Sequence, residues 1–128
     1  MSYYLAKRLA LPFADALERT RNALKEAGFG IIAEIDIAAT LRQKLGVDFR
    51  KYCILGACNP ALAYEALRIE DKVGTLLPCN VIVQEIDGGG SEVAAIDPVA
   101  AMQAVANPQL AELAARVRTL LEQVIARL

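Results

Sequence analysis

The chain has 128 residues, a length typical of one domain with a single hydrophobic core. Hydrophobic residues make up 55% of it and charged residues 23%, which is the composition of a folded globular protein and not of a disordered one. The net charge is −1 and no segment carries a basic stripe, which argues against nucleic acid as a partner.

The sequence contains no histidine, and this absence removes several classes of chemistry. Histidine is the commonest general base and the commonest metal ligand, so Ser-His-Asp and Cys-His hydrolases and histidine-based zinc sites are excluded. No apolar run is long enough to span a bilayer, and Lys7 and Arg8 interrupt the first apolar stretch too early for a signal peptide. We therefore expect a cytoplasmic protein without membrane contact, whose three cysteines are free thiols.

Proline, glycine and N-cap residues mark where the predicted helices begin and end. Four of the five prolines stand where a helix should begin, and three of these four follow Asn or Asp. Gly28 and Gly46 end helices, and the glycine-rich turn at 87–90 joins two β-prone runs into a hairpin. The elements predicted in chain order are a strand over 3–10, a helix over 12–27, a strand over 29–35, a short helix over 37–45, a strand over 51–58, a helix from 60, a connector or short strand over 74–77, strands over 79–86 and 91–96, a short helix from 98, and a last helix over 108–128.

Apolar spacing assigns a buried face to each of the longer helices. For the helix after Pro60 the predicted buried residues are Leu62, Ala63, Ala66 and Leu67. The last helix has a stripe of Leu110, Leu113, Val117, Leu120, Val124 and Leu128. β-α-β units followed by a hairpin predict an α+β fold: a single domain over 1–128 with a small mixed β-sheet of about five strands, helices packed mainly on one face, and a C-terminal amphipathic helix.

Four segments carry a likeness to a known family. They are GFGIIAEIDIAATLRQKLG at 28–46, YCILGACNPALAYEAL at 52–67, LLPCNVIVQE at 76–85 and AIDPVAAM at 95–102. In this order and spacing the chain resembles the domain of unknown function 302 family over residues 3–105, with the helix at 107–128 as an extension. The resemblance implies a small α+β fold found in compact, often dimeric, bacterial and archaeal proteins, and it implies no catalytic activity.

Two Cys-Asn pairs at predicted strand ends form the candidate site. Cys58 precedes Asn59, the expected N-cap of a helix, where unpaired N–H groups and the helix dipole favour a thiolate. Cys79 and Asn80 begin the next strand, so both sulfurs lie at one end of the sheet if the two strands are antiparallel, and at opposite ends if they are parallel. The alternative interpretation is that these cysteines are buried apolar residues, as Cys53 is expected to be, and that the asparagines bond to backbone groups.

Asp36 and Asp97 are the candidate carboxylates. Each follows a predicted strand and precedes a helix, so an N-cap is the simpler interpretation of both. Convergence with Cys58 would instead let them hold a metal ion or share a proton. Cys58 and Cys79 are the candidate metal ligands, because thiolates select zinc or monovalent copper, although without histidine a closed site needs carboxylates or a second subunit.

The sequence shows no CxxC, Walker or dinucleotide-binding motif, so it predicts no catalytic activity and names no cofactor. The first hypothesis is a domain that binds a small ligand or a protein partner near the Cys58 and Cys79 strand ends. The alternatives are a thiol-based redox or soft-metal protein, and a structural homo-oligomerisation module that packs through its C-terminal helix. The expected partners are a second copy of the chain, a small molecule or a metal ion. The ligand-binding candidates are Cys58, Asn59, Cys79, Asn80, Asp36 and Asp97.

Overall fold

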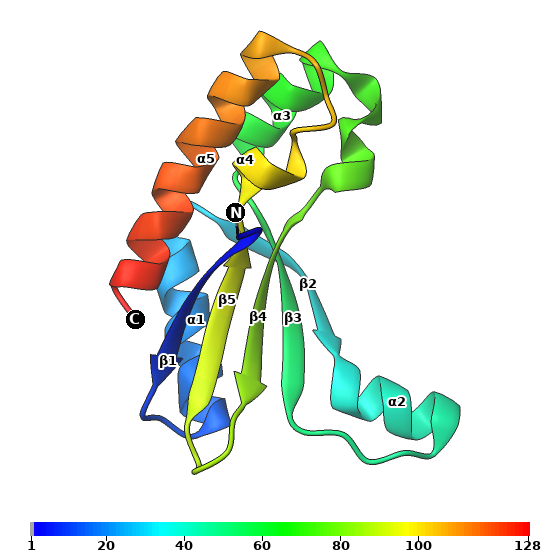
Figure 1. Cartoon of the computed structure of the whole chain (residues 1–128), viewed down its shortest axis with the longest axis vertical. Coiled ribbons are helices and arrows are strands. Elements are labelled where there is room, and N and C mark those ends of the chain that lie inside the picture. Colours follow the sequence, from blue (N-terminus) through cyan, green and yellow to red (C-terminus); the bar gives the residue numbers. More distant parts are fainter. Residues whose placement is uncertain (1) are drawn as a thin grey trace.

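The computed structural model describes residues 2–128, which form five strands with helices between and after them (Figure 1). Most predicted elements are present, with ends that differ by one or two residues. In chain order the elements are β1 (Tyr4–Leu9), α1 (Phe13–Glu26), β2 (Gly30–Asp36), α2 (Ile37–Leu45), β3 (Tyr52–Cys58), α3 (Pro60–Ile69), the 3-10 helix η1 (Asp71–Leu76), β4 (Cys79–Glu85), β5 (Ser91–Ile96), α4 (Pro98–Ala101) and α5 (Pro108–Ala126).

The five strands form one sheet in the order β1-β5-β4-β3-β2, and every neighbouring pair is antiparallel. The predicted α+β class and the five-stranded sheet are confirmed, whereas the expected mixture of parallel and antiparallel strands is absent from residues 2–128. A parallel pair requires the connecting helix to return the chain to the starting end of the sheet. Figure 1 shows that α3 and η1 instead lie beyond the end of β3, so β4 begins where β3 finishes and runs back beside it.

One face of the sheet carries the main core. Its alternating residues are Cys53, Leu55 and Ala57 in β3, Val81 and Val83 in β4, and Val93 and Ala95 in β5, all of them buried. The helices α1 and α5 cover this face, and they contribute Leu24, Leu121 and Val124 to the same core. Burying one such aliphatic side chain stabilises the fold by roughly 1.5–3 kcal/mol. The apolar stripe predicted for the last helix is therefore used inside the chain.

Between α1 and β4, some of the predictions made from local sequence patterns are confirmed and others are wrong. Gly28 has φ +89°, as the predicted helix end requires, but Pro12 is the N-cap of α1 and not its first residue. The prediction that Leu67 is buried is wrong, because α3 packs against α5 through Leu62 and Ala66 and leaves Leu67 44% exposed. Residues 74–76 of the connector predicted over 74–77 belong to η1 and Leu77 is its C-cap, so the interpretation of this segment as a short strand is also wrong.

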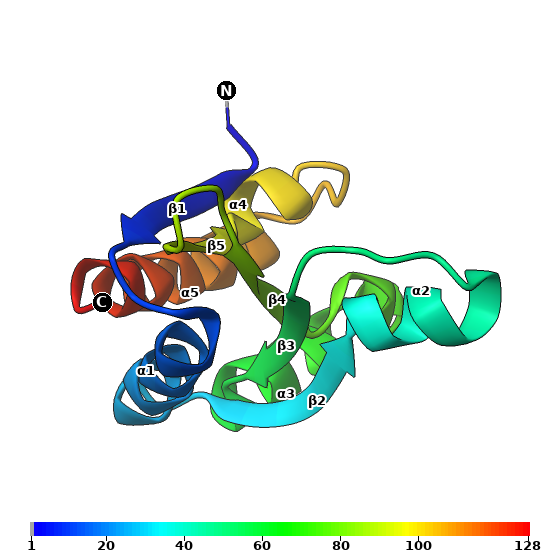
Figure 2. The same cartoon turned by 90° about the horizontal axis from the view of Figure 1, so that it is seen from below.

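The opposite face of the sheet is not covered by a helix. Its residues include Tyr4, Ile54, Ile82, Ala94 and Ile96, and it is called the open face below. Figure 2 shows α1 and α5 on one side of the sheet and α2 with its following loop on the other. Residues 37–51, called the arm below, project from the sheet, and none of the α2 residues is buried.

No helix in the described part of the chain has the length and apolar character needed to cross a bilayer.

Candidate functional site

The pairing of β3 with β4 brings the two Cys-Asn segments to the same end of the sheet. The strands are antiparallel and Ala57 lies opposite Cys79, so Cys58 is one residue beyond that pair. Side chains alternate between the two faces of a strand, which places Cys79 on the covered face with Ala57. Cys53, Cys58 and Cys79 are all free thiols.

An apolar cavity of about 50 Å³ lies at this end of the sheet, and both Cys58 and Cys79 line it. Its walls come from the ends of β3 and β4 and from α3, α4 and α5, and they include Leu62, Met102 and Leu110. The cavity is called the thiol cavity below. Because one water-sized sphere needs roughly 10–15 Å³, it has room for a small group and not for a drug-sized ligand.

Asn59 lines the thiol cavity and is the N-cap of α3, one of the helices that border it. Its Oδ1 accepts a hydrogen bond from the Leu62 backbone N–H at 3.2 Å, and α3 then begins with Pro60. The predicted N-cap is thus confirmed, and this oxygen is already occupied. Asn80 lies opposite Gly56, is exposed, and borders a hollow on the open face, so it does not line the thiol cavity among the described residues.

Burial raises the pKa of the Cys79 thiol from 9.0 to about 11, and the neighbouring Cys58 contributes a smaller part of this rise because two thiolates repel each other. At neutral pH Cys79 is therefore a neutral thiol. Burial also raises the pKa of Cys53, with Glu34 as the next cause. The thiolate is the nucleophile and the metal ligand, so Cys79 is a poor nucleophile in this setting.

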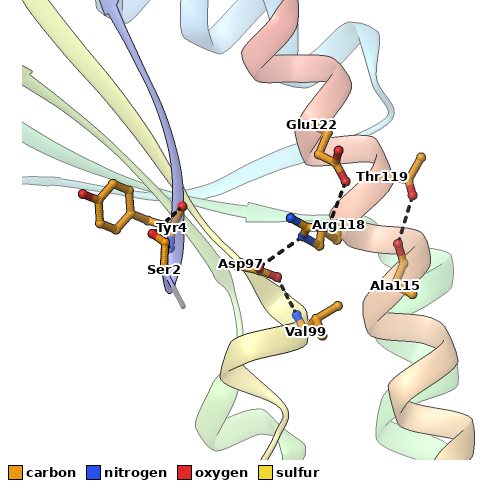
Figure 3. Close-up of polar contacts among 8 residues, drawn as sticks. All are labelled: Ser2, Tyr4, Asp97, Val99, Ala115, Arg118, Thr119 and Glu122. Carbon is orange, nitrogen blue, oxygen red and sulfur yellow. Dashed lines mark hydrogen bonds and ion pairs between the residues drawn. The ribbon is translucent and has the colours of Figure 1, made fainter.

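Asp97 follows β5 at the same end of the sheet, but its two oxygens are both engaged. One accepts a hydrogen bond from the Val99 N–H at 2.9 Å and so caps α4, and the other lies 3.1 Å from Nε of Arg118 on α5 (Figure 3). Arg118 also lies 3.5 Å from Glu122 on the same helix. Asp97 is 8% exposed, so this contact is a partly buried ion pair that fixes α4 against α5.

Asp36 lies at the opposite end of the sheet. It pairs with Cys53 across β2 and β3, whereas Gly30 at the start of β2 pairs with Cys58, and the length of β2 between them spans roughly 20 Å. Its Oδ1 caps α2 by accepting from the Ala39 N–H at 2.9 Å. Asp36, Asp97 and Cys58 therefore do not converge, and no group of three or more Cys, Asp or Glu side chains in residues 2–128 is placed to hold a metal ion.

Two features of the site were not predicted from the sequence. A Cβ at Gly56 would lie 2.9 Å from Cγ of Pro78, so glycine lets the Leu77-Pro78 corner, which has a cis peptide bond, lie against β3. A glycine inside a β-prone run can indicate that another part of the chain approaches the strand closely, so the sequence did contain a signal for this contact. The partnership of Arg118 with Asp97 had no signal, because 21 residues separate them.

A family model described as "Domain of unknown function DUF302" matches residues 5–128, and so continues through α5 beyond residue 105. The chain is also similar to a solved structure, the crystal structure of an uncharacterized conserved protein DUF302 from Bacillus stearothermophilus. The TM-score is 0.91 at 26% sequence identity, over 99% of this chain and 98% of that one. No curated protein matches.

Proposed function

We propose that this chain, which belongs to the DUF302 family, binds a small uncharged apolar ligand in the thiol cavity, through contacts that include Cys58 and Cys79. The observation that carries the proposal is the cavity itself, which Cys58, Asn59 and Cys79 line. The ligand is a small molecule or the apolar end of a larger one. Asn80 and Asp36 take no part, because both lie outside the cavity lining.

The chemistry of the lining supports an apolar ligand. Apart from the amide of Asn59, the walls are alkyl, thioether and thiol groups, and a charged group placed among them would lose its hydration without gaining a charged partner. Cys79 stays neutral, because burial has raised its pKa, so it offers no charge to an ionic ligand. Asn59 already uses its oxygen to cap α3.

The size of the cavity limits the ligand. A cavity of roughly 150 Å³ lined by Leu, Ile and Phe stays dry and binds benzene or xenon, and the thiol cavity at about 50 Å³ is a third of that. A cavity of this volume admits a group the size of a xenon atom or a short alkyl end. Met102 lies in the wall, and a flexible methionine side chain can rearrange to admit a slightly larger group.

The experiment is a titration of the full chain with xenon, ethane and benzene, followed by backbone and methyl NMR shifts. We expect saturable shifts confined to residues around the cavity. Ala66 lines the cavity and is 6% exposed, so Ala66→Leu fills the space and abolishes the shifts. Ala61 lies on the same helix and is exposed, so Ala61→Leu is the matched control and leaves them intact.

Absence of saturable shifts with all three probes would contradict the proposal. Equal loss of binding in the Ala66→Leu and Ala61→Leu chains would also contradict it, because the exposed position does not face the cavity.

The two alternative functions have less support at this site. A redox or soft-metal role needs an available thiolate, and Cys79 holds its proton to about pH 11 while no third ligand group accompanies the two cysteines among the described residues. Oligomerisation through the C-terminal helix needs a free apolar stripe, and Leu110, Leu121 and Val124 are buried within the chain.

A further inference from the structure

A polar hollow of about 580 Å³ lies between α3 and the first half of α5, two helices that lie side by side in Figure 1. Its volume is within the roughly 300–1,000 Å³ that small-molecule sites occupy in proteins. The hollow is called the charged hollow below. Four charged and two aliphatic side chains line most of it, and these are Glu65, Arg68, Glu112, Arg116, Ile69 and Leu113.

The helical repeat sets the four charges opposite one another. Glu65 and Arg68 are three residues apart on α3, and Glu112 and Arg116 are four apart on α5, so each pair lies on one side of its helix. The end of α3 and the start of α5 both line the hollow, and Glu65 and Arg116 meet farther from these ends. The two helices are therefore antiparallel, and Arg68 lies across from Glu112.

Only one of these two facing pairs is an ion pair. Nη1 of Arg116 lies 3.7 Å from Oε2 of Glu65. Arg68 forms no ion pair with any residue of 2–128, and its guanidinium lies 5.6 Å from the centre of the Tyr64 ring. Glu112 has neither a hydrogen bond nor an ion pair from its side chain within the same part of the chain. An unpaired cation and an unpaired anion thus face each other across packed helices, whose axes are typically about 8–10 Å apart.

The floor and the charges together define the class of ligand. Leu113 is buried and Ile69 is half-buried, and both belong to the apolar contact that joins α3 to α5. An anion in the hollow would be repelled by its two glutamates, and a cation by its two arginines. A small zwitterion can place each of its charges beside an opposite one, and an aliphatic body would then rest on the apolar floor.

We propose that the charged hollow binds an α-amino acid with an aliphatic side chain, its carboxylate on Arg68 and its ammonium group on Glu112. A guanidinium can donate two parallel hydrogen bonds to a carboxylate, which fixes the orientation of the ligand. Both side chains are exposed, so water and salt weaken these contacts and we expect a dissociation constant of about 1 mM. The site is distinct from the thiol cavity, with which it shares only Leu113.

The test is a titration of the full chain with leucine, followed by the NMR shifts of the backbone amides. We expect saturable shifts at the end of α3 and the start of α5. Three related compounds then remove one feature each: N-acetyl-leucine lacks the ammonium group, leucinamide lacks the carboxylate, and glycine lacks the side chain. N-acetyl-leucine and leucinamide should each bind at least about fivefold more weakly than leucine, since each loses one exposed ion pair, and glycine should also bind more weakly because it leaves the floor uncovered.

Variants of the chain test which residue holds which group. Arg68→Gln should weaken leucine by at least about fivefold and leave leucinamide nearly unchanged, because leucinamide has no carboxylate to lose. By the same reasoning Glu112→Gln should weaken leucine and leave N-acetyl-leucine nearly unchanged. Both side chains are exposed, so the fold tolerates the changes. Arg19→Gln replaces an exposed arginine on α1, outside the hollow, and is the matched control that should leave every constant unchanged.

Absence of saturable shifts with leucine would overturn the proposal. So would leucinamide or N-acetyl-leucine binding as tightly as leucine, or Arg68→Gln weakening leucine no more than Arg19→Gln does. Equal weakening of leucine and leucinamide by Arg68→Gln would also overturn it, because the arginine would then not hold the carboxylate. Arg68 does not line the thiol cavity, so xenon should bind Arg68→Gln as it binds the wild type, and the two ligand proposals can fail separately.

Discussion

The pKa of Cys79 provides a prediction about stability at alkaline pH. In the unfolded chain the thiol loses its proton near 9.0, whereas in the folded chain it keeps the proton to about pH 11. Between these values the unfolded state has released a proton that the native state still binds, so the free energy of unfolding falls as pH rises. The contribution is fully present below pH 9 and is lost as pH rises through about 11.

The size of this effect follows from the two pKa values. A difference of one between the folded and unfolded pKa corresponds to about 1.36 kcal/mol, so the stability linked to Cys79 decreases by about 1.4 kcal/mol at pH 10 and by about 2 kcal/mol at pH 11. The variant Cys79→Val removes the titrating group and keeps a β-prone side chain of similar size at the start of β4.

The assay is urea unfolding of the wild type and of Cys79→Val at several pH values above neutral. All other ionisable groups are common to both chains, so their effects largely cancel when the two free energies are subtracted. We expect the difference to be constant below pH 9 and to fall above it. A difference that stays flat to pH 11 would refute the claim that Cys79 lies in a dry apolar setting.

Three further predictions concern the residues that build the site. Asp97→Ala should lower the free energy of unfolding by about 1–3 kcal/mol in urea unfolding, since it removes the cap of α4 and one of the two acidic partners of Arg118. Asp36→Ala at an exposed cap should cost about 1 kcal/mol in the same assay. Gly56→Ala should cost about 1–3 kcal/mol in the same assay, because its Cβ would meet the Pro78 ring at 2.9 Å. Leu110→Ala should cost about 2–5 kcal/mol and enlarge the thiol cavity, so benzene should bind more tightly by calorimetry.

Matched controls separate these effects from general loss of packing. Gly30→Ala places a Cβ no closer than 3.8 Å to its neighbours and should be nearly neutral, so equal cost at the two glycines would contradict the steric reasoning. Leu121 lies on the same helix as Leu110 but in the main core, so Leu121→Ala should destabilise without a gain in benzene affinity. A similar gain in both leucine variants would show that the thiol cavity is not the site.

Local signals predicted the elements of this fold well, because each depends on a few neighbouring residues. The Asn59-Pro60 and Asp97-Pro98 pairs begin helices as expected, since cap and proline chemistry act within one turn. The strand directions could not be predicted in the same way. Whether β4 runs with or against β3 depends on where α3 and η1 pack, which involves residues on α5 far along the chain.

The site illustrates the same division between local and long-range information. The sequence identified Cys58 and Cys79 and stated the condition for their proximity, which the antiparallel register satisfies. The sequence did not reveal that Asp36 lies far from Cys58 and Cys79, because only the pairing of β2 with β3 places that carboxylate at the other end of the sheet. The exposure of the arm was missed too, since Ile37, Leu41 and Leu45 have the four-residue spacing of a buried helix face, whereas none of the α2 residues is buried.

The most direct test of the ligand-binding claim is a crystal structure of the untreated full chain under xenon pressure. We expect xenon density between Cys58, Cys79 and Leu62 in the wild type, and none at that position in Ala66→Leu. A cavity that remains free of xenon, or that holds ordered water bonded to the thiols, would contradict the account, because the space would then be either inaccessible or polar.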